Sequence, residues 1–178
     1  AALGYVVIEG GSFVIDAGGD GIQAETGLVV SGGDLTVTAG GGSAQGSVFD
    51  EDDSISTKGL KGVAELTITG GSFIIDSADD TLHSNGNLTV TNGEFLLATG
   101  DDGLHSDADL RIDGGEITIT TSYEGIEGAS VTINATWTGT ETISGRIMGG
   151  NAGTQAKSVI IQARAVIVIT SIVYTNGT

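Results

Sequence analysis

The chain has 178 residues, of which 31 are Gly and none is Pro or Cys, and its formal net charge is −17 at pH 7. This length predicts one domain with a sizeable core, and the lack of Cys excludes a disulfide scaffold and any thiolate metal site. The charge argues against nucleic acid and anionic membrane surfaces as direct partners, because both are bound through Lys and Arg, and it favours cations.

Short runs with an apolar residue at every second position recur along the chain, on both sides of Gly-Gly or Asn-Gly pairs. The pairs lie 22 residues apart except for one interval of 38: 10–11, 32–33, 70–71, 92–93 and 114–115. The period of two predicts strands with one face inward, and the Gly pairs indicate corners that need a positive φ. A single apolar residue follows at a third position of each unit: Ile22, Leu60, Leu82, Leu104 and Ile126.

These units predict an all-β fold, a single-stranded parallel β-helix with coils of about 22 residues, and we expect it to be right-handed. An antiparallel barrel would not explain why the same residue types recur at a fixed period. We predict one domain over residues 1–178, with regular coils over 1–134 and an insertion near 41–57. Residues 135–178 are expected to form degenerate coils and a cap.

Acidic residues occupy one column of the aligned repeats, where adjacent coils place equivalent residues about 4.8 Å apart. The column and the residues flanking it are Asp20, Lys58, Asp79, Asp80, Asp101, Asp102 and Glu124. Stacked carboxylates repel one another by about 1 kcal/mol per contact in water and more when partly buried, so a cation is expected among them. Clustered carboxylates suit Ca²⁺. The predicted metal ligands are Asp20, Asp79, Asp80, Asp101, Asp102, Asp107, Glu124 and Glu127.

Other polar residues have more than one interpretation. His83 and His105 stack at a spacing of 22 residues, and they are either outward ladder residues, sugar ligands or a zinc pair. Lys58 and Lys61 are either counter-charges for the acids or ligands for an acidic sugar. Asp50–Asp53 is a solvated loop or a second ion site, and the acidic column itself has a solvated alternative.

The few aromatic residues divide between the core and the surface. Phe13, Phe73 and Phe95 fall on inward columns and are predicted to form a core ladder. Three others fall outside those columns and are candidate stacking faces for sugars: Tyr5, Tyr123 and Trp137.

The segments GGSFIIDSADDTLHSNGNLTVTNG, GDDGLHSDADLRIDGGEITIT and SYEGIEG, with STKGLKG, resemble a family of secreted bacterial carbohydrate-binding β-helix proteins. This clostridial cellulose- and polygalacturonate-binding family has a pectate-lyase-like fold, and the resemblance covers about residues 4–133. It implies calcium at Asp79, Asp80, Asp101, Asp102 and Glu124, an extracellular or cell-surface location, and binding of plant cell-wall polysaccharide without cleavage.

The expected function is therefore calcium-dependent, non-catalytic binding of polygalacturonate or other acidic sugars, with cellulose resting on the resemblance alone. Calcium held partly by protein can bridge to uronate carboxylates. One alternative is a calcium-dependent polysaccharide lyase, for which Arg111, Lys58 or Lys61 would have to serve as the base. The other is a surface-adhesion solenoid with no defined sugar site.

Overall fold

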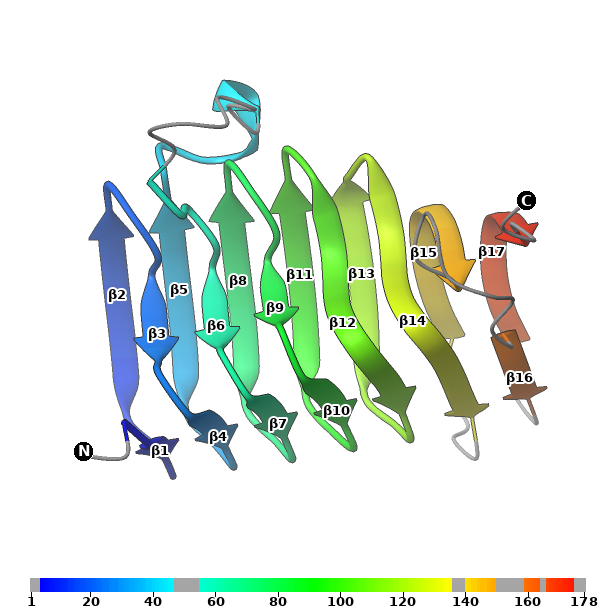
Figure 1. Ribbon diagram of the computed structural model, residues 1–178, viewed down its shortest axis with the longest axis horizontal. Coiled ribbons are helices and arrows are strands. Elements are labelled where there is room, and N and C mark those ends of the chain that lie inside the picture. The colour runs from blue at the N-terminus through cyan, green and yellow to red at the C-terminus, as the bar shows by residue number, and fades with distance from the viewer. Residues whose placement is uncertain (1–3, 47–54, 136–139, 150–158, 164–165, 175–178) are drawn as a thin grey trace.

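The computed structural model describes residues 4–46, 55–135, 140–149, 159–163 and 166–174, and their side chains as far as residue 134 (Figure 1). The fold is a β-solenoid of about five turns with coils about 22 residues apart. Each strand pairs in parallel with its equivalent in the next coil, which confirms the predicted parallel β-helix. Its handedness stays a prediction.

Three faces run along the solenoid, and each is a stack of parallel strands. The first face consists of β2 (Ser12–Ala17), β5 (Asp34–Ala39), β8 (Ser72–Ser77), β11 (Glu94–Thr99), β13 (Glu116–Thr121) and the first halves of β15 (Thr140–Gly149) and β17 (Val166–Tyr174). Figure 1 shows these strands side by side, with the chain termini at opposite ends of the stack.

The second face consists of β3 (Ile22–Ala24), β6 (Leu60–Gly62), β9 (Leu82–Ser84), the first halves of β12 (Asp102–Ile112) and β14 (Glu124–Ala135), and the second halves of β15 and β17. The third face consists of β1 (Val6–Ile8), β4 (Gly27–Val30), β7 (Glu65–Ile68), β10 (Asn87–Val90), the second halves of β12 and β14, and β16 (Val159–Ala163).

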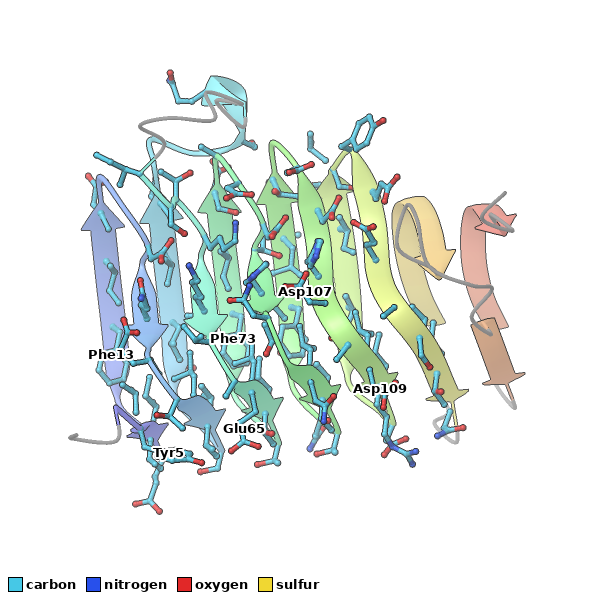
Figure 2. The ribbon with its side chains drawn as sticks, in the orientation of Figure 1. Tyr5, Phe13, Glu65, Phe73, Asp107 and Asp109 are labelled. Carbon is cyan, nitrogen blue, oxygen red and sulfur yellow. The ribbon has the colours of Figure 1, made fainter. Side chains whose placement is uncertain are left out.

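The apolar columns meet in the interior and form one continuous core. On the second face Ile22, Leu60, Leu82, Leu104 and Ile126 are successive partners, as the sequence period predicts. The rings of Phe73 and Phe95 stack with centroids 4.6 Å apart, and Phe13 packs at the edge of the same core (Figure 2). The predicted phenylalanine ladder is thus confirmed.

The corners between the third and first faces depend on glycine. The second residue of each pair has a positive φ, for example 109° at Gly33 and 117° at Gly71, which confirms the role predicted for the pairs. A Cβ at Gly33 would also lie 3.0 Å from the carbonyl oxygen of Gly11 in the preceding coil. Coil stacking and corner geometry therefore both require Gly there.

The 38-residue interval corresponds to an excursion between β5 and β6, which includes a short 3₁₀ turn at Ser43–Gln45. After residue 134 the strands β15, β16 and β17 continue the parallel stacks, so the coils extend beyond the regular repeat. In the part of the chain that the structure describes, no helix has the length and apolar character needed to cross a membrane.

Candidate metal centre

The acidic column lies at the corner where the first face turns into the second. Asp80 follows β8, while Asp102 and Glu124 begin β12 and β14, and Asp102 and Glu124 are direct partners in the parallel ladder. The Asp102 backbone nitrogen donates to Asp80 Oδ1 at 3.1 Å. All three side chains are buried, with 3%, 3% and 5% of the residue exposed. The predicted row of stacked carboxylates is therefore present.

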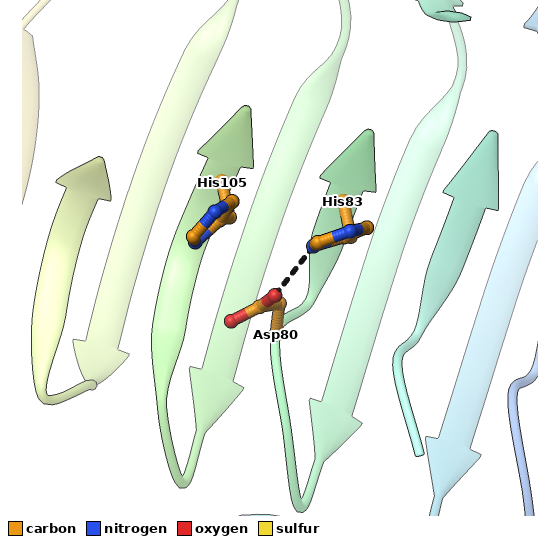
Figure 3. Close-up of side chains that lie close together, drawn as sticks. All are labelled: Asp80, His83 and His105. Atoms are coloured by element: carbon orange, nitrogen blue, oxygen red, sulfur yellow. Dashed lines mark hydrogen bonds and ion pairs between the residues drawn. The ribbon is translucent and has the colours of Figure 1, made fainter. Parts of the chain in front are cut away.

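The two histidines occupy the neighbouring column, and each contacts the aspartate three residues before it; Figure 3 shows this contact for His83 and Asp80. His83 Nδ1 lies 2.7 Å from Asp80 Oδ2, and His105 Nδ1 lies 2.8 Å from Asp102 Oδ2. The rings stack with centroids 5.0 Å apart. Because the pairing is between residues i and i+3 of a repeated corner, the same contact forms one coil later.

His105 connects three carboxylates. Its Nδ1 lies 3.3 Å from Glu127 Oε2 as well as close to Asp102, and its Nε2 lies 3.1 Å from Asp107 Oδ1. Asp107 in turn accepts a hydrogen bond from Asn85 Nδ2 at 2.9 Å. Asp107 lies on the exposed side of the second face, outside the buried row (Figure 2).

A separate cluster, called the oxygen group below, offers oxygen donors alone. Asp79, Asp80 and Asp101 bring carboxylate oxygens within 4.8 Å of one another, and Asp79 and Asp101 are only partly buried. Lys58, in the coil before, pairs through Nζ with Asp79 and lies 3.5 Å from Asp80 Oδ2. The predicted counter-charge is thus present, although one ammonium cannot balance three carboxylates.

The described residues contain three such groups that could hold a metal ion: Asp79–Asp80–Asp101, Asp80–His83–His105 and Asp102–His105–Glu127. Among the predicted metal ligands, Asp20, Asp107 and Glu124 belong to none of the three. Asp20 lies on the far side of Lys58, where its Oδ1 accepts from the Lys58 backbone nitrogen at 2.8 Å and its Oδ2 lies 3.8 Å from Lys61 Nζ.

The electrostatics of the corner show a surplus of negative charge. Burial, together with the charges of Asp80 and Asp79, raises the pKa of Asp101 to about 6. Burial and the adjacent Asp102 carboxyl raise the pKa of Glu127 to about 7. Burial also raises the pKa of Asp102. The raised pKa values mean that the ionised form of each carboxyl group is disfavoured, as expected for clustered acids with too little positive charge nearby.

Contacts between acids and bases outweigh burial at His105 and at Asp80. Burial alone would lower the pKa of His105, but its contacts with Asp102, Asp80 and Glu127 outweigh burial and raise it to about 10. Burial would raise the pKa of Asp80, but the hydrogen bond from His83 and the charge of Lys58 lower it. The sequence analysis expected a cation among the carboxylates and did not predict that the two histidines would compensate them.

An exposed aromatic residue lies beside the oxygen group. The Tyr123 backbone nitrogen donates to the Asp101 carbonyl at 2.7 Å, and Tyr123 is 67% exposed. Tyr5, 51% exposed, lies at the other end of the solenoid, before β1. Trp137 and the acidic segment 50–53 lie outside the residues whose structure is described.

Comparison with known proteins gives one family. A family model described as "Carbohydrate-binding domain-containing protein" matches residues 1–103. The chain belongs to this family. The match includes the whole oxygen group of this carbohydrate-binding chain and ends before His105 and Glu127. No curated protein and no solved structure matches the chain.

Proposed function

We propose that the chain is a non-catalytic, extracellular protein that binds acidic plant cell-wall polysaccharide, of the polygalacturonate type, through calcium. The observation that carries this proposal is the group of Asp79, Asp80 and Asp101 in a chain of a carbohydrate-binding family. Calcium takes six to eight oxygen ligands in flexible geometry, so a partly exposed set of carboxylates leaves positions open for oxygens of a sugar.

Charge explains why a cation is needed. A protein with net charge −17 repels a polyuronate, and salt screens that repulsion only beyond about 8–10 Å. The Asp79 side chain remains 21% exposed, so an ion bound there has access to solvent. A calcium ion coordinated by Asp79 and Asp101 would present positive charge to a uronate carboxylate, and would relieve the repulsion that raises the pKa of Asp101.

Tyr123 supplies a second element of the proposed site. Its ring is exposed one coil beyond Asp101, where it can pack against the apolar face of a sugar ring. Neutral cellulose would depend on such stacking alone, and the described residues include just two strongly exposed aromatic side chains, Tyr5 and Tyr123. The proposal therefore favours acidic sugars over cellulose.

A binding role without cleavage agrees with the positions of the basic residues. Arg111 donates from Nε to Asp113 Oδ2 at 2.7 Å on the third face, away from the acidic corner. Lys58 is held in ion pairs with Asp79 and Asp80. Neither basic group is positioned as the free base that a lyase mechanism requires.

Retention on immobilised polygalacturonate tests the proposal. We expect retention in calcium, little retention in EDTA, and weak rescue by magnesium, which keeps its own water ligands. Asp101→Asn should lower the affinity more than about tenfold. Asp109→Asn, an exposed residue on the third-face half of β12, makes the same charge change and should have no effect. Equal retention in EDTA, or equal loss in both variants, would contradict the proposal.

A further inference from the structure

The group formed by Asp102, His105 and Glu127 differs chemically from the oxygen group, because it contains an imidazole nitrogen. We propose that these three residues form a separate site for a borderline divalent transition metal such as Zn²⁺, bound through His105 Nδ1 and one oxygen of each carboxylate. Imidazole and carboxylate together suit zinc and its neighbours, whereas calcium takes oxygen ligands.

The first argument is that two carboxylates converge on one nitrogen. Asp102 Oδ2 lies 2.8 Å and Glu127 Oε2 lies 3.3 Å from His105 Nδ1. A single N–H proton cannot serve both oxygens well, whereas a metal ion between the three atoms would. Ligands about 2.0–2.1 Å from a tetrahedral zinc lie roughly 3.3 Å apart. The two N···O distances here are close to that value, and the three ligand atoms all lie within 4.8 Å of one another.

The second argument is an unpaired buried oxygen. The Asp102 side chain is only 5% exposed, and its Oδ1 is buried with no hydrogen-bond partner. A buried polar atom that makes no hydrogen bond is costly, and His105 satisfies only the other oxygen of this carboxylate. A metal ion with charge +2 at Asp102 would compensate both this carboxylate and Glu127.

The third argument concerns the far side of the ring. Histidines that bind metals almost always donate their other N–H to a carboxylate or carbonyl, which fixes the ring and its tautomer. His105 Nε2 lies 3.1 Å from Asp107 Oδ1, and Asn85 holds the other oxygen of Asp107. With Nε2 held in this way, Nδ1 faces Asp102 and Glu127, and zinc would bind there by displacing the Nδ1 proton to solvent. Asp107 is thus assigned as a positioning residue.

Titration of metal-free protein with ZnCl₂ in excess calcium tests this inference independently of sugar binding. We expect one zinc per chain, with affinity lowered more than about tenfold by His105→Gln and by Glu127→Gln. Asp79→Asn, which alters only the oxygen group, should leave the zinc affinity unchanged and lower the calcium affinity. Glu127 is partly exposed, so Glu127→Gln should fold even if His105→Gln does not.

The histidine nitrogens give a readout that a purely structural role would not. Zinc should shift the ¹⁵N resonance of His105 Nδ1 in the wild type and leave Nε2 hydrogen-bonded. Zinc binding that survives both His105→Gln and Glu127→Gln, or zinc and calcium lost together in Asp79→Asn, would overturn the assignment. His105 would then be a protonated counter-ion. Failure of zinc binding alone would leave the calcium proposal standing.

Discussion

The rings of His83 and His105 stack one coil apart, with centroids 5.0 Å from each other. Each ring directs Nδ1 to the aspartate three residues before it, so the two imidazoles lie alongside the two buried carboxylates of Asp80 and Asp102. This relation follows from the 22-residue period, because residues that repeat in the sequence become neighbours in space. It makes the acidic corner a mixed ladder of acids, imidazoles and the ammonium groups of Lys58 and Lys61.

Removing the ammonium group of Lys58 should destabilise the corner. Lys58→Met leaves Asp79 and Asp80 without their ion-pair partner, so we expect a loss of about 3 kcal/mol in the free energy of unfolding in EDTA. Calcium should restore part of it. Arg111→Met removes the same charge from an exposed pair and should cost less than about 1 kcal/mol. Equal losses in denaturant titrations of the two variants would show that Lys58 has no special role.

The raised pKa of Glu127 predicts a dependence of stability on pH. Its folded pKa of about 7 exceeds the ordinary value of 4.5, so the folded protein disfavours the ionised form. The stability that this raised pKa contributes is fully present below about pH 4.5, where Glu127 is protonated in both states. It is lost as pH rises from about 4.5 to about 7, and above that the free energy of unfolding stays constant. Glu127→Gln lacks this loss. In EDTA the variant should match the wild type at pH 4 and melt at a higher temperature at pH 8.

The control for that prediction is an acid outside the corner. Asp109→Asn should have the same melting temperature as the wild type at both pH values, because Asp109 is exposed. A difference between the wild type and Glu127→Gln that is the same at pH 4 and pH 8 would contradict the assigned pKa. Comparing the three melting curves at both pH values separates these outcomes.

The phenylalanine ladder is part of the buried core, so truncating its members should lower the free energy of unfolding. Phe95 is 4% exposed and stacks on Phe73, so Phe95→Ala should cost about 3–5 kcal/mol. Phe13 lies at the partly buried end of the ladder, so Phe13→Ala should lower the free energy of unfolding clearly less. Urea titration of the two variants checks the order, and a larger loss at Phe13 would show that the coils near β2 carry more of the core than the packing indicates.

Glycines at the corners should differ sharply in how well they tolerate substitution by Ala. A Cβ at Gly86 would clash with the carbonyl oxygen of Ala64 in the preceding coil, whereas a Cβ at Gly18 would meet nothing within 4 Å. We expect Gly86→Ala to lower the melting temperature strongly and Gly18→Ala to leave it nearly unchanged. If thermal melts show both variants alike, the close coil contact at Gly86 is not present in solution.

The sequence was sufficient to predict the solenoid and its ladders, because a fixed period converts spacing along the chain into neighbours in space. Leu60, Leu82 and Leu104 are partners for this reason, and so are the stacked Asp102 and Glu124. The period also placed His83 above His105.

Side-chain direction could not be predicted in the same way. The period does not show that Lys58 reaches forward to Asp79, or that His105 turns Nδ1 toward Asp102 and Nε2 toward Asp107. These choices depend on rotamers and on which buried charge lies within reach, so the sequence underestimated the compensation within the corner. It found the acidic residues but not their division into an oxygen group and a nitrogen-containing group.

The most direct test of calcium binding at the acidic corner is a thermal melt of the chain in EDTA, repeated after calcium or magnesium is restored. If the carboxylates hold calcium, a hundredfold excess over the dissociation constant adds about 2.7 kcal/mol and raises the midpoint by about 5–10 °C. Magnesium should raise it less, and Asp101→Asn should remove most of the calcium effect. A midpoint that is the same in EDTA and calcium, with no metal retained by the protein, would contradict the account.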